Sequence, residues 1–405
     1  MKTIGIIAEF NPFHNGHKYL IDKAKKITKA ENVIIICSGN YVQRGEPAFY
    51  DKTIRAQAAL QNGADLIIEL PVVYATSSAE TFAYGAIDLL NKLNCVDYLC
   101  FGCETLNINV LPTIAKILID EPVDYLNMLS VYLKNGFSFP KARANALTDY
   151  CSDNKLFNSV ILNNILNKSN NILAIEYLKA LKKTNSKIKP LAIKRQGSDY
   201  NSSELSNNFA SATGIREAIL IEKSINSYIP DNCMDLYTDK YVKFMDFNQI
   251  LGYKLLDTLD FSSIYDISED LANRICKLKD EYTNPVEFIK TLQSKNYTYS
   301  SISRALTHII LGIKQEDVDF FKNNKCNYYA KILGFNKSSP LLSILKKKSS
   351  IDIISKFSSY YKSADKDTKR LLDIELAADS LYRMTYMTKY QESIHNEFTR
   401  KIVII

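Results

Sequence analysis

The chain has 405 residues, of which 46% are hydrophobic and 23% are charged, and it carries a net charge of +7 at pH 7. This length can bury a full apolar core over two or three domains. The eight cysteines are too sparse for a disulfide scaffold, and no apolar run approaches the roughly 20 residues that span a bilayer. The first residues do not resemble a signal peptide, so we expect a cytoplasmic protein with no membrane partner.

The first hundred residues alternate between short apolar runs and amphipathic segments. The apolar runs at residues 3–9, 32–38, 65–71 and 97–102 predict buried strands. The amphipathic segments at 16–30, 51–64 and 78–94 predict helices. Strands this apolar are covered on both faces, so the alternation predicts an α/β fold with a parallel, doubly wound sheet.

The pattern changes twice after residue 103. Residues 104–183 are mainly helical in pattern, with an interruption at 135–147, and a further strand is expected at 188–195. The segment 211–224 predicts a helix that begins on Ser and Thr. From about residue 227 the chain is largely helical in pattern. We therefore predict two domains: a catalytic α/β domain at 1–228 and a mainly α-helical domain at 229–405.

Two of the four histidines, His14 and His17, lie in "FNPFHNGH" at residues 10–17. The strand at 3–9 ends there and the helix begins near Gly16, so the pair lies at the carboxyl end of a strand, where open α/β sheets bind ligands. The N–H groups of a helix N-terminus suit a phosphate, and the histidines can donate to its oxygens. A zinc site would need further ligands, and His308 and His395 are far away in the sequence.

Cysteine spacing also gives no metal site. Cys100 and Cys103 form one CxxC pair, but no second pair or nearby histidine completes a zinc site. We expect small buried thiols there.

The "FNPFHNGH" segment resembles the HxGH signature of the nucleotidyltransferase superfamily, whose Rossmann-like fold cleaves ATP between the α- and β-phosphates. "SATGIR" at 211–216 is similar to the superfamily's Ser/Thr-rich helix start beside the triphosphate. Hydroxyl and N–H groups of a helix start, with Arg216 one turn further on, fit that role. Plain helix capping is the alternative reading for Ser211 and Thr213.

Further segments resemble one family within this superfamily, the bacterial tRNA(Met) cytidine acetate ligases. They run in order along nearly the whole chain: residues 37–60, 101–104, 170–181, 193–201, 297–313 and 331–336. The resemblance implies a ligase that uses ATP and acetate to make acetyl-adenylate and pyrophosphate, without acetyl-CoA. The acetyl group then passes to N4 of the wobble cytidine of elongator tRNA(Met), giving N4-acetylcytidine. Magnesium is expected with ATP.

The resemblance also implies site residues. His14, His17 and Arg216 would be catalytic. The ATP site would be lined by Ile7, Ala8, Glu9, Phe10, Asn11, Pro12, Phe13, His14, Asn15, Gly16, His17, Lys18, Tyr19, Leu20, Gly102, Asn170 or Asn171, Arg195, Ser211 and Thr213. The sequence does not choose between the two asparagines.

Two positions near the motif carry separate hypotheses. Many superfamily members have Asp where this chain has Asn11, and an uncharged amide fits a carboxylate substrate that Asp would repel. The segment "GNYVQRGEP" at 39–47 resembles a loop over the site, in which Asn40, Gln43 and Arg44 would contact acetate or tRNA. The alternative is that Arg44 and Glu46 tie the loop down. Asp51 is expected to cap the next helix.

The second half is rich in basic and aromatic residues, which neutralise phosphates and stack on unpaired bases. We expect this half to bind the anticodon arm of the tRNA beside the ATP cleft. The alternative is that the lysines only form a solvated face. The residues are Lys322, Lys325, Lys331, Lys337, Lys346, Lys347, Lys348, Lys356, Lys362, Lys366, Lys369 and Arg370, with Tyr328, Tyr329, Tyr360 and Tyr361. His308 lies on an apolar helical pattern and is expected to be structural.

Two other functions fit parts of the sequence. A small-molecule adenylyltransferase of the pantetheine-phosphate type shares both phosphate motifs, but that function does not account for the second half of the chain. A nucleotide-sensing RNA-binding protein without catalysis is the other alternative. The oligomeric state stays open at this point.

Overall fold

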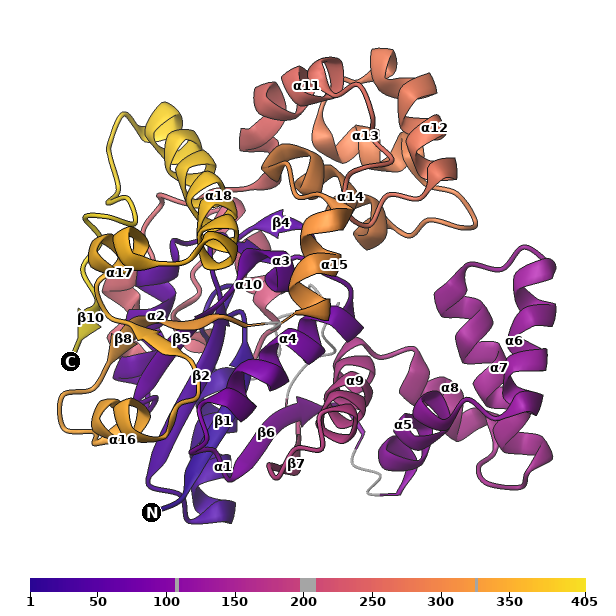
Figure 1. Cartoon of the computed structure of the whole chain (residues 1–405), viewed down its shortest axis with the longest axis horizontal. Coiled ribbons are helices and arrows are strands. Elements are labelled where there is room, and N and C mark those ends of the chain that lie inside the picture. Colours follow the sequence, from indigo (N-terminus) through magenta and orange to yellow (C-terminus); the bar gives the residue numbers. More distant parts are fainter. Residues whose placement is uncertain (106–108, 197–208, 325–326) are drawn as a thin grey trace.

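A computed structural model describes residues 1–105, 109–196, 209–324 and 327–405 of the chain (Figure 1). Lys325, Cys326 and residues 197–201 of the family-like segment at 193–201 lie outside the described residues. In the described part no helix is long and apolar enough to cross a membrane.

Five parallel strands form the centre of the fold (Figure 1). They lie side by side in the order β5-β2-β1-β6-β7 and are β1 (Thr3–Ala8), β2 (Asn32–Ser38), β5 (Leu66–Leu70), β6 (Tyr98–Cys103) and β7 (Lys189–Lys194). The helices between or after them include α1 (Asn15–Thr28), α2 (Lys52–Gln61), the short α3 (Val72–Ala75), α4 (Ala79–Lys92) and α10 (Ala212–Leu220). The predicted α/β alternation and parallel, doubly wound sheet are confirmed.

The core lies on both faces of this sheet because successive side chains of a strand point to opposite faces. In β2, Ile34 and Ile36 pack in one apolar cluster with Leu89 of α4. Val33 and Ile35 pack in a second cluster with residues of α1 and α2. All four β2 side chains are fully buried, which explains why the strand reads as a continuous apolar run.

Among the described residues, five helices lie between β6 and β7. They are α5 (Val110–Asp120), α6 (Val123–Lys134), α7 (Phe139–Asp153), α8 (Ser159–Leu166) and α9 (Ser169–Lys183). The helical prediction for this stretch is confirmed, but the interruption expected at 135–147 is shorter. Pro140 lies in the first turn of α7, where the missing N–H has no helical partner to lose, so the helix begins there rather than breaking.

The second half begins with short 3-10 turns and a group of helices. These are η1 (Asn226–Tyr228), η2 (Asp231–Leu236), η3 (Phe244–Phe247), α11 (Asn248–Asp257), α12 (Glu269–Leu278), η4 (Lys279–Glu281), α13 (Pro285–Leu292), α14 (Tyr299–Leu311) and α15 (Gln315–Asn323). Figure 1 shows α11–α14 as a lobe beside the sheet. We call α11–α14 the helical lobe.

The chain then returns to the main sheet. β8 (Tyr329–Phe335) pairs antiparallel with β5, and β9 (Asp352–Ile354) and β10 (Val403–Ile404) pair parallel with β8. The helices α16 (Leu341–Lys348), α17 (Phe357–Ser363) and α18 (Lys366–Tyr390) accompany them. The sheet thus takes strands from beyond residue 229, and the second half is not helical throughout. A short apolar run such as residues 329–335 cannot be told from a buried helix by periodicity, which is why these strands were missed.

A buried ionic cluster ties the C-terminal part to the α/β part. Lys52 Nζ lies 2.8 Å from Glu69 Oε1, and Lys331 Nζ lies 2.6 Å from Glu69 Oε2. Both lysines also pair with Glu397, and each of the four residues is at most 5% exposed. Since buried charges need partners, residues 327–405 pack as part of the same body as the sheet.

Candidate functional site

The strand order places a crevice between β1 and β6. From β1 the chain moves to β2 on one side, and it later returns to β6 on the other side, so the connections diverge at the carboxyl ends of β1 and β6. A pocket lies there. It is lined by Ile7, Ala8, Glu9, Phe10, Asn11, His14, His17, Leu20, Gln43, Phe82, Phe101, Gly102, Asn170, Leu173, Tyr177, Arg195, Ala212, Thr213 and Arg216.

The two histidines hold each other at the start of α1. His14 is the N-cap, and its Nδ1 accepts a hydrogen bond from the N–H of Gly16 at 3.0 Å. His17 Nδ1 accepts from the N–H of His14 at 3.2 Å. Because both Nδ1 atoms accept, the proton of each neutral ring is on Nε2. The ring centroids are 3.8 Å apart, so the pair offers two neighbouring Nε2–H donors.

Burial keeps both rings neutral. It lowers the pKa of His14 to about 3, with a further contribution from the charge of Arg195. It also lowers the pKa of His17 well below its usual value, helped by His14 and Arg195. The pair therefore donates hydrogen bonds without carrying charge.

Both phosphate motifs meet in the pocket. Ser211 caps α10, and its side chain accepts from the N–H of Gly214 at 3.0 Å, as the capping alternative states. Arg216 Nη1 donates to the carbonyl oxygen of Asn11 at 2.7 Å. This hydrogen bond joins the first motif to the second, and Arg216 lines the same pocket as the two histidines. Thr213 lines the pocket, whereas Ser211 is buried behind it.

The opposite side of the pocket comes from β6, β7 and α9. Gly102 lies against Arg195, because an added Cβ there would be 3.1 Å from Arg195 Cγ. Asn170 lines the pocket, and its Nδ2 donates to Glu104 at 2.6 Å. Asn171 is fully buried, and its Oδ1 accepts from the N–H of Glu104 at 3.0 Å. Of the two asparagines, Asn170 is thus the one that a ligand can reach.

The hairpin of β3 (Tyr41–Val42) and β4 (Glu46–Pro47) brings one residue, Gln43, to the pocket. Gln43 lines the pocket and its N–H donates to Glu9 Oε1 at 2.7 Å. Burial raises the pKa of Glu9, while this hydrogen bond and three nearby arginines act in the opposite direction. Asn11 Oδ1 accepts from the N–H of Phe49 at 2.7 Å, so its amide NH₂ is the group that can donate to a ligand.

Asn40 lies outside the pocket. It is 4% exposed, and its Nδ2 donates to Asp51 at 3.1 Å and to Asp379 at 3.2 Å. Asp51 caps α2 through the N–H of Thr53, as predicted. The predicted residues that do not line the pocket are Pro12, Phe13, Asn15, Gly16, Lys18, Tyr19, Asn40, Arg44, Asn171 and Ser211.

Sequence comparisons identify the family. The chain matches the family model described as HIGH Nucleotidyl Transferase over residues 1–397. The tRNA(Met) cytidine acetate ligase of Thermoanaerobacter sp. (strain X514) is 44% identical over 95% of this chain and 96% of its own. That of Acetivibrio thermocellus is 39% identical over the whole of both chains. This chain belongs to the tRNA(Met) cytidine acetate ligase family.

Solved structures agree with this membership. Thermotoga maritima TmcAL in its apo form matches with a TM-score of 0.94 and 31% identity over the whole of both chains. A second crystal form of the same protein, bound with α-thio ATP, matches with a TM-score of 0.90 and 31% identity over all of this chain and 99% of that one. The Rossmann-like nucleotidyltransferase fold is therefore confirmed.

Sequence reasoning missed the apolar walls of this ligase-family pocket. They are Phe82, Phe101, Leu173 and Tyr177, with Ala212 at the start of α10. Apolar side chains on a buried strand or helix face look the same in sequence whether they face a core or a ligand. Phe101, Leu173, Tyr177 and Ala212 lie in segments that resemble the family, and only Phe82 lies outside them.

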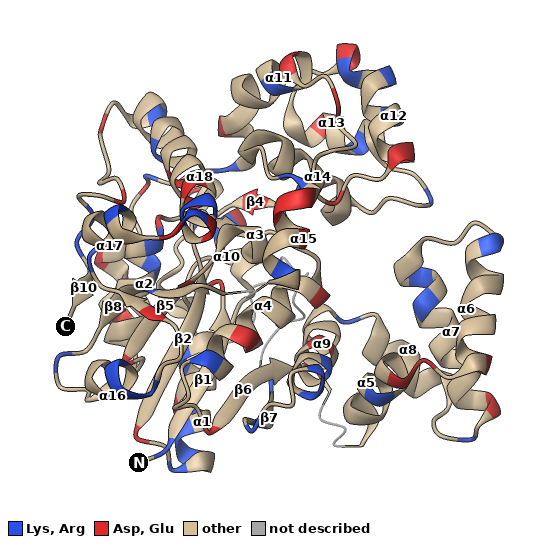
Figure 2. Cartoon of the chain, viewed as in Figure 1, with Lys and Arg blue, Asp and Glu red and all other residues tan. Residues whose placement is uncertain are grey.

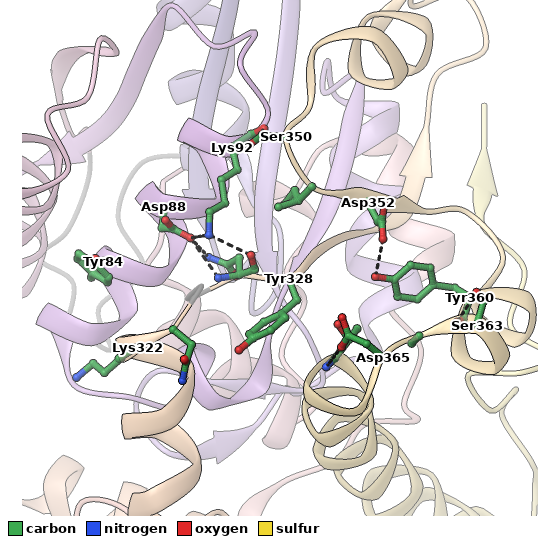
Figure 3. Close-up of a pocket in the computed structure, with 15 residues that line it drawn as sticks. Tyr84, Asp88, Lys92, Lys322, Tyr328, Ser350, Asp352, Tyr360, Ser363 and Asp365 are labelled. Atoms are coloured by element: carbon green, nitrogen blue, oxygen red, sulfur yellow. Dashed lines mark hydrogen bonds and ion pairs between the residues drawn. The ribbon is translucent and has the colours of Figure 1, made fainter.

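The basic and aromatic second half does not form one surface. Tyr329 and Lys331 are buried in β8, so the prediction that they contact RNA is wrong. Tyr328, Tyr360 and Lys322 line a separate cavity between α4, β9 and the start of α18 (Figure 3). The Tyr360 hydroxyl donates there to Asp352 at 3.1 Å, and the Tyr328 ring is 7% exposed. Neither ring is an open stacking platform.

Four of the lysines predicted to contact tRNA lie at the edge of the sheet opposite the ATP pocket. β8 runs antiparallel to β5, so residues that follow β8 lie where the parallel strands begin. The N–H of Asn336 donates to the carbonyl of Asp65 at 2.9 Å, next to the start of β5. Figure 2 shows α16, with its basic residues, near the amino terminus of the chain. Lys337 and the α16 lysines Lys346, Lys347 and Lys348 thus lie opposite the pocket, and not beside it as expected.

His308 and the cysteines have structural roles. His308 is fully buried, with its two ring nitrogens 3.0 and 3.1 Å from the carbonyl oxygens of Tyr265 and Thr76, as predicted. Cys100 and Cys103 are buried free thiols. The residues that the structure describes contain no group of three His, Cys, Asp or Glu side chains that could hold a metal ion.

Proposed function

We propose that this chain is an ATP-dependent ligase that joins acetate to N4 of the wobble cytidine of elongator tRNA(Met). The single observation that carries the proposal is the convergence of His14, His17 and Arg216 at the carboxyl end of β1. Two neutral Nε2–H donors and a guanidinium suit the oxygens of a triphosphate. Relatives named tRNA(Met) cytidine acetate ligase over the full length support the choice of acceptor.

In the first step an acetate oxygen attacks the α-phosphorus of ATP and pyrophosphate leaves. Negative charge builds on the phosphate oxygens during this displacement, and donors fixed in advance stabilise it without reorganising. The histidines are fixed by the start of α1, and Arg216 is fixed by the carbonyl of Asn11. The Asn11 amide can donate to the acetate carboxylate, which is the role expected for an uncharged residue at this position.

In the second step the cytidine amine attacks the acetyl carbon, AMP leaves, and the amine loses a proton. The mixed anhydride is already activated, so this step needs positioning more than further chemistry. Magnesium reaches the site on the ATP phosphates, since Glu9 is the only carboxylate among the described residues that line the pocket. Acetyl-CoA is not needed for either step.

Acetate-dependent exchange of labelled pyrophosphate into ATP tests the first step without tRNA. The ligase exchanges pyrophosphate only when acetate is present. An adenylyltransferase of the pantetheine-phosphate type exchanges only with a phosphorylated alcohol. A nucleotide-sensing protein without catalysis exchanges with neither, and either of these results overturns the proposal.

A further inference from the structure

The family-like segment at 297–313 has no part in the ATP site, yet it forms α14 and carries buried polar side chains. Ser303, Thr307 and His308 are 0%, 1% and 0% exposed. Buried hydroxyl and imidazole groups in a helix are costly unless they hold a partner. The two hydroxyls have their partner in the α/β part of the chain, and His308 contacts Thr76 there as well as Tyr265 of the second half.

The two hydroxyls hold the tip of the β3–β4 hairpin. Ser303 Oγ and Thr307 Oγ1 donate to the carbonyl oxygen of Gly45 at 2.7 and 2.6 Å. Gly45 has a φ of +75°, and a Cβ there would lie 2.3 Å from the backbone nitrogen of Arg304. The hairpin tip therefore lies directly on the backbone of α14, and only glycine fits.

The hairpin carries Gln43 to the pocket. The N–H of Gln43 donates to Glu9 Oε1 at 2.7 Å, and its Nε2 donates to the carbonyl of Ser77 at 3.2 Å. His308 Nε2 lies 3.1 Å from the carbonyl of Thr76, the residue before Ser77. Two of the anchors of Gln43, the hairpin tip and the 76–77 turn, are thus held by α14, and the third is Glu9.

These contacts fix which atom Gln43 can offer to a ligand. A carbonyl oxygen only accepts, so the side-chain atom beside Ser77 is the nitrogen, and Oε1 is the side-chain acceptor that this contact leaves for the pocket. An acceptor repels acetate and phosphate oxygens. It can receive a hydrogen bond from the exocyclic amine of a nucleobase.

We propose that Ser303 and Thr307, with His308, are positioning residues that hold Gln43 so that its Oε1 accepts a hydrogen bond from a nucleobase exocyclic amine. The amine belongs either to the adenine of ATP or to the incoming cytosine. This inference rests on the proposed function, and it gives the helical lobe a direct connection to the pocket. The other polar groups of the pocket, among them the two histidines, Asn11 and Arg216, are held within the α/β part. Disturbing α14 therefore affects Gln43 selectively.

The test compares the full-length double variant Ser303→Ala/Thr307→Val with the hydroxyl-retaining Ser303→Ala/Thr307→Ser. Ser301→Ala and Thr291→Val are matched controls, since these hydroxyls bond only to nearby groups in their own segments. Three quantities are measured: affinity for ATP and for purine riboside triphosphate, which lacks the amine; acetate-dependent pyrophosphate exchange; and single-turnover transfer of acetyl to tRNA(Met).

If the amine is that of adenine, the double variant loses at least fivefold of the preference for ATP over purine riboside triphosphate. If it is that of cytosine, transfer slows at least fivefold while pyrophosphate exchange stays within twofold. In either case the Ser303→Ala/Thr307→Ser variant recovers most of the lost ATP preference or transfer rate. Equal loss of both half-reactions with the ATP preference kept, or no change in any quantity, overturns the inference. Absence of pyrophosphate exchange in the unaltered protein refutes the proposed function instead, and the ATP preference still tests the positioning.

Discussion

Gly45→Ala is the substitution whose cost follows most directly from the structure. The new Cβ would lie 2.3 Å from Arg304 N and 2.4 Å from Arg304 Cα, both backbone atoms that cannot turn away. To reach ordinary contact the hairpin tip must retreat by about 1 Å. The two hydrogen bonds to the Gly45 carbonyl, at 2.7 and 2.6 Å, would then exceed about 3.5 Å and be lost.

The expected destabilisation has two parts. Placing a Cβ at positive φ costs about 1–2 kcal/mol. Leaving buried hydroxyls and a carbonyl unpaired adds about 1–3 kcal/mol for each lost hydrogen bond. We expect a free energy of unfolding lower by roughly 3–8 kcal/mol. If the hairpin detaches locally instead, proteolysis within residues 41–47 appears first.

Gly136→Ala is the matched control. Gly136 has a φ of +77°, but an added Cβ meets nothing within 4 Å. It should cost only the positive-φ part, about 1–2 kcal/mol, in the same urea or thermal unfolding experiment. If Gly45→Ala is no more destabilising than Gly136→Ala and its hairpin is no more sensitive to protease, the described packing of the hairpin on α14 is wrong.

Three further predictions follow from other parts of the structure. His14→Asn keeps a good helix cap but removes an Nε2–H donor, so pyrophosphate exchange should fall about 10²–10³-fold with little change in melting temperature; a loss explained by unfolding would contradict this. His308 has its pKa lowered to about 4 by burial, so only the unfolded chain takes up its proton between about pH 6.5 and 4, and about 3 kcal/mol of stability is lost as the pH falls through that range. His308→Gln should flatten that part of a stability–pH curve, and an unchanged slope would show that His308 does not cause it. Replacing Lys337, Lys346, Lys347 and Lys348 with Ser removes four positive charges, which weakens tRNA binding in general. At a fixed salt concentration we expect no more than about a twofold further loss of tRNA affinity. A large further loss would place RNA at the far edge of the sheet.

Much of the fold could be predicted because its signals are local. Strands β1, β2, β5 and β6 are short and apolar on both faces, and Asp51 and Ser211 cap α2 and α10 at the predicted helix starts. β8 was missed because its pairing with β5 joins residues more than 250 positions apart, and nothing local in "YAKILGF" records that partner.

The candidate site divides in the same way. The histidines and Arg216 lie in recognisable motifs, and the strand–turn–helix context predicted the placement of the histidines at the carboxyl end of β1. The likeness of "SATGIR" to the family's second motif is what pointed to Arg216. The choice of Asn170 over Asn171 depends on which side of α9 faces the pocket, a one-residue difference below the accuracy of a helical pattern. Burial of Tyr329 and Lys331 follows from the return of the chain to the sheet, which composition does not show.

The most direct test of the account is incubation of the purified protein with ATP, ¹⁴C-acetate and a tRNA(Met) transcript. We expect ATP-dependent label on the tRNA, recovered as N4-acetylcytidine at the wobble position and absent when that cytidine is replaced by uridine. Label that requires acetyl-CoA, or no label on the tRNA although ATP is bound, would contradict it.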